Sequence, residues 1–169
     1  YRPDYLSPRD YKAKVRSSPL RSALVAAAQL KPPPGITRPT LRFIVRDQAR
    51  LSADLTRAQQ DAARLEQPLD RMARTLLPGM KYRDAEESPR WQAGYDLAMG
   101  RVLAQKVRTE TYNAMLAKAK LGMTFEKEKN NTWILESSDE ITVGSKWKRE
   151  ADTALMLLNT VAEEHPGTP

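Results

Sequence analysis

The sequence contains no cysteine and only one histidine, His165. Without cysteine, the chain cannot form disulfides, use a thiolate nucleophile or ligate a metal through sulfur. A lone histidine does not make a zinc site, and a histidine at a helix end more often contacts the last carbonyl groups of that helix. We therefore expect no metal site and no cofactor in this chain.

Catalytic sequence motifs are also missing. The chain has no Gly-x-Ser-x-Gly elbow, no Walker loop and no dinucleotide fingerprint. The acidic pairs Glu86-Glu87 and Asp139-Glu140 lack the alternating spacing of a calcium loop, so we interpret them as solvated loop charges. With no catalytic set of residues, we expect a protein that is not an enzyme.

Long apolar runs and aromatic residues are scarce. The longest apolar run, ALVAAA at 23–28, is far shorter than the roughly 18 residues of a membrane span. Aromatic residues make up 7% of the chain, while alanine and leucine dominate its apolar positions, a composition typical of packed helices. We therefore expect no transmembrane segment. We interpret Trp91, Trp133 and Trp147 as core anchors rather than as a binding platform.

The net charge of +7 is concentrated near the N-terminus. Residues 1–50 hold 11 Lys/Arg and 3 Asp/Glu, a net charge of +8, whereas the remaining residues are close to neutral. An excess of this kind can bind nucleic acid, an anionic surface or an acidic protein domain. The candidate interaction residues, interleaved with Tyr5 and Tyr11, are Arg9, Lys12, Lys14, Arg16 and Arg21.

Serine–proline pairs predict two short helices in the basic N-terminal arm, residues 1–38. A serine cap followed by proline at the first helical position is a typical helix start, and it occurs at Ser7-Pro8 and Ser18-Pro19. The sequence KPPPG at 31–35 excludes helix and predicts a stiff extended spacer. We treat residues 1–38 as an arm and residues 39–169 as the helical domain.

Two long amphipathic helices are predicted in residues 39–169. From Thr37 or Thr40 to Leu77 the pattern is helical, and its apolar positions repeat at coiled-coil-like spacings of 4-3-4-3: Leu51, Leu55, Ala58, Ala62, Leu65, Leu69, Met72 and Leu76. Pro68 predicts a kink or short break near residues 64–68. Ser88-Pro89 starts a second long helix that runs to about Leu121 and stops at Gly122. Helices joined by a short loop should pack antiparallel.

A third helix completes the predicted bundle. Residues 132–136 indicate a short extended segment, and Ser145 is the expected cap of a helix that ends near Glu164. Gly94 and Gly100, inside the second long helix, indicate a close neighbour such as another helix or a tryptophan side chain. The predicted fold is all-α: an antiparallel bundle of two long helices and a C-terminal helix. The apolar heptad-like positions do not indicate whether these helices pack within one chain or in a homo-oligomer. Alanine at Ala58 and Ala62 favours close packing within one chain.

The two ends of the sequence indicate a piece of a longer protein. The chain begins at Tyr1 rather than methionine, and it ends on Thr168-Pro169, a pattern typical of a helix start. His165-Pro166-Gly167 just before it is typical of a helix end. We therefore expect flanking regions beyond both ends.

Four stretches resemble one protein family: YRPDYLSPRDY, SPRWQAGYDLAMGRVLAQKVRTETYNAMLAKAK, NNTWILESSDEI and EEHPGTP. They are similar to the C-terminal region of large bacterial proteins that carry a von Willebrand factor A-type domain upstream. The resemblance implies that the basic arm joins that domain to the helical part, and that the protein is exported or associated with the cell envelope. The Asp-x-Ser-x-Ser loop that usually binds Mg²⁺ in that domain is absent from this chain, so the resemblance assigns no metal site here. The HPGTP ending also resembles turns between tetratricopeptide-like helices.

Two functions are consistent with the sequence. The first is a non-enzymatic helical scaffold or protein-interaction module attached to the upstream domain, whose partner is another protein or that domain itself. The alternative is binding of nucleic acid or an anionic surface through the basic arm, which predicts a steep dependence on salt.

Overall fold

The computed structural model describes residues 5–31, 38–45, 47–122 and 130–166. These residues form a mostly α-helical bundle, as predicted. Its elements in chain order are α1 (Pro8–Arg16), α2 (Pro19–Ala28), β1 (Arg42–Ile44), α3 (Gln48–Leu76), the 3-10 helix η1 (Leu77–Tyr82), α4 (Pro89–Lys120), β2 (Thr132–Ile134) and α5 (Ser145–Glu164).

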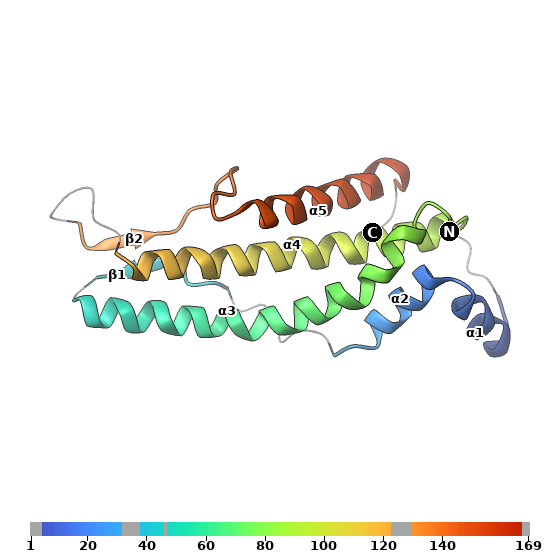
Figure 1. Ribbon diagram of the computed structural model, residues 1–169, viewed down its shortest axis with the longest axis horizontal. Helices are drawn as coiled ribbons and strands as arrows, with labels where there is room; N and C mark the ends of the chain where they lie inside the picture. Colours follow the sequence, from blue (N-terminus) through green and yellow to red (C-terminus); the bar gives the residue numbers. More distant parts are fainter. Residues whose placement is uncertain (1–4, 32–37, 46, 123–129, 167–169) are drawn as a thin grey trace.

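Helix α4 is the centre of the molecule. Helices α3 and α5 pack against it on opposite sides, so the long helices form a single elongated layer (Figure 1). Helix α2 packs against η1, α3 and α4 at one end of the layer, and the two strands lie at the other end. Among the described residues, no helix combines the length and the apolar character that crossing a membrane requires.

The predicted helix starts are confirmed, with one correction. Ser7, Ser18 and Ser88 are the N-cap residues of α1, α2 and α4, and each is followed by proline. Gly144, not Ser145, is the cap of α5, and Ser145 is the first residue of that helix. The φ of Gly144 is 153°, a conformation that residues with a side chain rarely adopt. The predicted stop at Gly122 also has a positive φ, 112°.

The expectation that helix begins directly after Thr37 or Thr40 is wrong. Residues 42–44 form strand β1, which pairs antiparallel with β2, and Phe43 lies opposite Trp133. Helix α3 begins only at Gln48, where the Asp47 carboxylate accepts a hydrogen bond from the Arg50 N–H at 2.7 Å. The partner strand, predicted near 132–136, is confirmed. The predicted spacer at 31–35 lies outside the described residues except for Lys31.

Pro68 does not break α3. The helix is continuous from Gln48 to Leu76, and its ribbon changes direction in its second half (Figure 1). A proline inside a helix removes one backbone hydrogen bond and crowds the preceding turn, which bends the helix. Of the predicted kink or short break, the structure has a bend, and the helix continues through it.

The buried side chains form two separate clusters along the layer. The first joins α2, α3, α4 and α5 around Tyr95 and Leu20, and Trp91 packs against it. The second joins β1, α3 and α4 around Phe43 and Leu116, and Trp133 packs against it. The apolar heptad-like positions predicted on α3 contribute residues to both clusters.

Candidate binding groove

A groove with a volume of about 640 Å³ lies along the junction of α3 and α4. Its floor is built from the two helices, and its walls come from two non-helical segments, residues 38–41 and 135–143. The residues that line it are Arg38, Pro39, Thr40, Leu41, Ala58, Asp61, Ala62, Leu65, Leu69, Gln105, Arg108, Thr109, Thr111, Tyr112, Met115, Leu135, Glu136, Ser137, Ser138, Glu140, Ile141, Thr142 and Val143.

A non-helical segment can form one wall of the groove because α5 is shorter than α4. Helix α5 begins at Ser145 and covers only part of α4, and the chain between β2 and α5 runs along the rest (Figure 1). Ala58 and Ala62 lie on the floor, where larger side chains would occupy the space. Ala58 also packs in the second core cluster with Leu116, so the predicted close packing is confirmed there.

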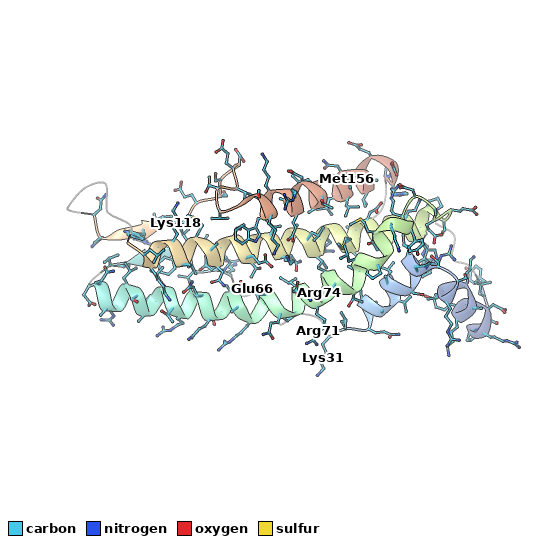
Figure 2. All side chains as sticks on the ribbon, viewed as in Figure 1. Lys31, Glu66, Arg71, Arg74, Lys118 and Met156 are labelled. Atoms are coloured by element: carbon cyan, nitrogen blue, oxygen red, sulfur yellow. The ribbon has the colours of Figure 1, made fainter. Side chains whose placement is uncertain are left out.

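Hydrogen bonds on the α3–α4 junction fix how the two helices align beside the groove. The Gln59 amide donates to the Asn113 carbonyl oxygen at 3.5 Å, and the Asn113 amide donates to Glu66 Oε1 at 2.8 Å. Figure 2 shows Glu66 on α3 where that helix faces α4. In this antiparallel alignment, Leu69 and Gln105 lie at one end of the groove.

Tyr112 joins the floor of the groove to one of its walls. Its phenol donates a hydrogen bond to the carbonyl oxygen of Thr40 at 2.7 Å. Burial raises the pKa of Tyr112, an effect that the hydrogen bond to Thr40 partly offsets and the nearby charge of Asp61 reinforces. The phenol is therefore neutral at physiological pH and acts as a donor that holds residues 38–41 against α4.

The rim of the groove carries charges of both signs. Asp61 is paired with Arg64 at 3.2 Å on the exposed side of α3. In contrast, the side chains of Arg108, Glu136 and Glu140 have no hydrogen-bond or ion-pair partner within the described ranges. A site with an apolar floor and unpaired charges at its rim suits a ligand that has both apolar and charged groups.

The candidate residues of the basic arm are divided between two helices. Arg9, Lys12, Lys14 and Arg16 are exposed on α1. Arg21 lies on α2, is buried, and pairs with Glu86; its Nε donates to Glu86 Oε2 at 2.8 Å.

The Arg21–Glu86 pair corrects the interpretation of Glu86 as a solvated loop charge, because its side chain is only 3% exposed. The hydrogen bonds from Arg21 lower the pKa of Glu86 despite its burial. The Arg21 guanidinium also lies 5.3 Å from the centre of the Trp91 ring.

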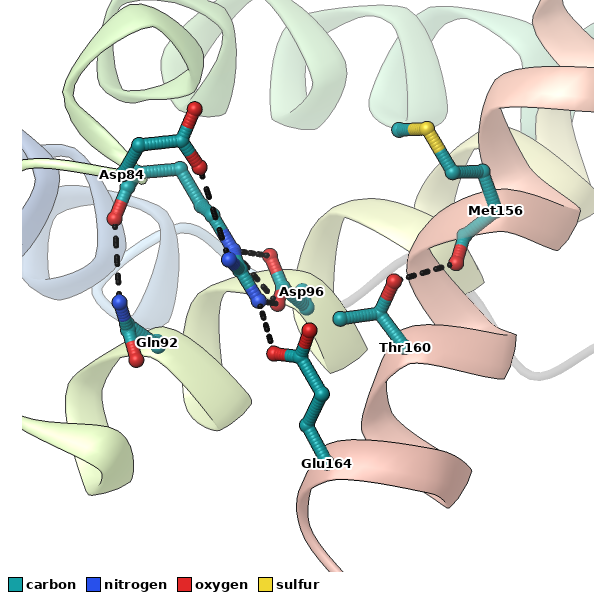
Figure 3. A network of polar contacts seen from close by, with 7 residues as sticks. Asp84, Gln92, Asp96, Met156, Thr160 and Glu164 are labelled. Atoms are coloured by element: carbon teal, nitrogen blue, oxygen red, sulfur yellow. Dashed lines mark hydrogen bonds and ion pairs between the residues drawn. The ribbon is translucent and has the colours of Figure 1, made fainter.

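Two further ionic clusters fasten α5 to α4. Near the C-terminal end of α5, Arg83 bridges the fully buried Asp96 and Glu164, with distances of 2.9 Å to each carboxylate (Figure 3). The hydrogen bond that Arg83 donates to Asp96 is the main reason that the pKa of Arg83 is raised. The charges of this cluster pair with one another, so we interpret the cluster as part of the fold rather than as a ligand site.

The second cluster surrounds Lys106, which is buried on α4. Its ammonium group lies 2.7 Å from Glu150 and 3.0 Å from Glu110. Burial alone would lower the pKa of Lys106, but the two carboxylates outweigh it and the pKa is raised. Trp147 donates its indole N–H to Glu110 at 2.7 Å.

A smaller cleft of about 300 Å³ lies between α1, α2 and the start of α4, beside Tyr11 and Trp91. The rings of these two residues are 6.4 Å apart. His165 is buried at the end of α5, where its backbone N–H donates to the Val161 carbonyl oxygen at 3.1 Å. Within the described ranges, no group of three or more His, Asp or Glu side chains is placed to hold a metal ion.

Sequence reasoning missed the groove because its walls come from segments without periodicity. The only local signal was the pair of alanines on the α3 seam, and alanine at such positions is more often a sign of close helix packing.

Comparisons with protein-family models, with curated proteins and with solved structures found no match for this chain.

Proposed function

We propose that this chain is a non-enzymatic helical scaffold or protein-interaction module. The observation that carries the proposal is the groove of about 640 Å³ with an apolar floor and, at its rim, charges that have no partner among the described residues. An apolar surface with charged edges is the usual composition of a protein-binding site, because burial of the apolar part drives association and the charges select the partner.

The elongated layer of helices supports a role in spacing or holding other domains. Three ionic clusters and two apolar clusters tie the helices together, so the layer is braced along its length. The sequence resemblance supplies the proposed neighbour, an upstream von Willebrand factor A-type domain. A mass-spectrometric peptide map of the native protein tests this attachment, and upstream peptides with an Asp-x-Ser-x-Ser loop are the expected result.

Chemical cross-linking of the native protein in its own cells tests the interaction itself. Exposed lysines such as Lys118 and Lys146 accept an amine-reactive cross-linker, and Figure 2 shows Lys118 near the C-terminal end of α4. We expect links from these lysines to a second protein or to another domain of the same chain. If every link joins two sites within residues 1–169, the module has no partner and the proposal fails.

Binding of nucleic acid by α1 is a second candidate, favoured by one observation. Four cationic side chains lie on a helix of nine residues, and the exposed Tyr5 precedes it. Cations that neutralise phosphates release counterions, and an exposed aromatic ring can stack on a base.

A labelled oligothymidylate titrated at several salt concentrations tests this candidate. The affinity should fall steeply with salt, and it should be lost when Arg9, Lys12, Lys14 and Arg16 are changed to glutamine. A control with the same number of changes at Arg57, Arg64, Arg71 and Arg74 on α3 should bind normally. Equal affinity of the two variants would exclude α1 as the binding surface.

A further inference from the structure

We propose that the groove between α3 and α4 binds an extended peptide segment of a partner protein, about five residues long, with apolar side chains at alternate positions and charges of both signs between them. The inference rests on the proposed interaction function, since it names the kind of partner that the groove takes.

The length of the groove suits an extended chain. Its floor on α3 runs from Ala58 to Leu69, and 11 helical steps correspond to about 17 Å along the axis. An extended chain advances about 3.3 Å per residue, so about five residues span this distance.

The walls of the groove offer backbone groups to such a chain. The pairing of β1 with β2 continues to a bond in which the Leu135 N–H donates to the Leu41 carbonyl oxygen at 2.8 Å. Beyond that bond, residues 38–40 and 136–138 make no backbone–backbone hydrogen bond within the described ranges. The Thr40 carbonyl oxygen is occupied by the Tyr112 phenol and Pro39 has no N–H, so the remaining groups of these residues are the ones available. Free N–H and C=O groups on an extended segment are the groups to which an added peptide strand binds.

The floor of the groove accounts for the alternating pattern. Leu65 and Leu69 on α3, Met115 on α4, and Ile141 and Val143 on the wall give it an apolar lining. In an extended peptide, successive side chains point to opposite sides. Every second side chain can therefore be buried against this lining, while the others point toward the rim.

The charges at the rim decide between a peptide and an apolar small molecule. Arg108 on α4 can pair with an acidic side chain, and Glu136 and Glu140 on the wall can pair with a basic one. A fatty acid would supply a carboxylate for Arg108, but it would leave the glutamates and the free backbone groups of the walls without partners. A peptide supplies all three kinds of group, so the peptide is the occupant that we infer.

Fluorescence anisotropy with defined peptides tests the inference. The probes are fluorescein-labelled peptides amidated at the C-terminus, with the sequences Leu-Asp-Leu-Lys-Leu and Leu-Lys-Leu-Asp-Leu, which cover both chain directions. We expect at least one of them to bind saturably. The control peptide Leu-Leu-Leu-Asp-Lys has the same composition without the alternation, and its affinity should be at least tenfold weaker.

Two pairs of protein variants locate the binding site. Thr109→Trp fills the groove, whereas Thr153→Trp places the same side chain on α5; both threonines donate a hydrogen bond to the carbonyl oxygen four residues earlier, so the changes are matched. Arg108→Glu reverses a rim charge, whereas Arg101→Glu reverses an exposed charge elsewhere on α4. We expect T109W and R108E to weaken binding at least tenfold, and T153W and R101E to change it less than twofold.

A charge swap separates an ionic contact from general damage to the fold. A peptide in which lysine replaces aspartate should bind R108E better than it binds the wild-type protein. The inference is overturned if neither alternating peptide binds at 1 mM, if the control peptide binds equally well, or if T109W and R108E bind like their matched controls. It is also overturned if dansyl-undecanoate binds in the groove and the peptides do not displace it. If the peptides fail while the cross-links to a partner persist, the module binds through another surface and the proposed function stands.

Discussion

Gly100 of α4 lies directly against Leu158 of α5. A Cβ atom at position 100 would be 2.8 Å from Leu158 Cγ, and the Ala154 carbonyl oxygen would be 3.3 Å away. The predicted close neighbour of Gly100 is thus confirmed as a leucine on another helix, and it is not a tryptophan. At Gly94, the nearest atom, Leu24 Cδ2, would be 3.4 Å from a Cβ, an ordinary contact.

The two glycines give a matched pair of substitutions within one helix. Alanine in place of glycine gains about 1 kcal/mol of helix stability at either position. At Gly100 this gain is opposed by overpacking, which costs about 1–3 kcal/mol. We expect Gly94→Ala to raise the free energy of unfolding and Gly100→Ala to lower it, measured by urea denaturation. Equal shifts in the two variants would show that α5 does not approach α4 as described.

Glu86→Gln tests the buried pair with Arg21. The change leaves a buried cation with a neutral partner, so we expect a loss of about 3 kcal/mol in the free energy of unfolding. The exposed neighbour provides the control, because Glu87→Gln should change stability by less than about 0.5 kcal/mol. A double variant, Arg21→Met with Glu86→Leu, removes both charges and should recover most of the loss. Similar stability of E86Q and E87Q would contradict the buried pair.

The same pair makes stability depend on acid pH. The hydrogen bonds from Arg21 lower the pKa of Glu86 in the folded chain, so the unfolded chain binds its proton first as the pH falls. The stabilisation is therefore complete above the unfolded pKa of about 4.3 and is lost as the pH falls through the folded value. Urea denaturation between pH 6 and pH 2 should show this loss in the wild-type protein. E86Q should lack this contribution to the pH dependence.

Lys106→Met tests the cluster that holds the start of α5. The change leaves Glu110 and Glu150 without their shared cation, and we expect a loss of about 2 kcal/mol. The control is Lys146→Met, because that ammonium group is largely exposed and lies 3.7 Å from Glu110. Because the folded pKa of Lys106 is raised, its stabilisation is complete below the unfolded pKa of about 10.4 and is lost as the pH rises through the folded value. A thermal melt of K106M no lower than that of K146M would refute the cluster.

Tyr95→Phe tests the anchor of the first core cluster. The fully buried phenol donates a hydrogen bond to the Leu76 carbonyl oxygen at 2.9 Å, at the end of α3. Its removal should cost about 1 kcal/mol, because the carbonyl group loses its donor. Burial raises the pKa of Tyr95 to about 12. A difference titration followed by ultraviolet absorbance should show one phenol that ionises near this pH in the wild-type protein and not in the variant.

Local signals predicted most of the helices. A serine cap followed by proline needs only its own turn of helix, so Ser7, Ser18 and Ser88 could be identified without any tertiary information. The heptad seam of α3 likewise follows one face of the helix, which supplies most of its buried residues. These features were predictable because the residues that cause them are neighbours in the sequence.

Features that depend on distant partners were not predictable. Strand β1 has only three residues and is held by a segment about ninety positions away, so its sequence carried no clear pattern. From the sequence alone, Glu86 is interpreted as a solvated charge in a loop, because nothing near it in the sequence indicates that Arg21 lies beside it. The groove depends on how residues 38–41 and 135–143 lie beside α3 and α4, which no single stretch of sequence specifies.

The pairing of β1 with β2 also has a consequence for the order of folding. It joins residues 88 to 92 positions apart, so closing this long loop costs more conformational entropy than packing two consecutive helices. Because the ladder is short, its hydrogen bonds offset little of that entropy. We therefore expect β1 and β2 to pair late in folding and to separate early in unfolding. In hydrogen exchange, the amides of Phe43 and Trp133 should therefore exchange through partial opening, well before those of Tyr95 and Met99, which require the whole molecule to unfold.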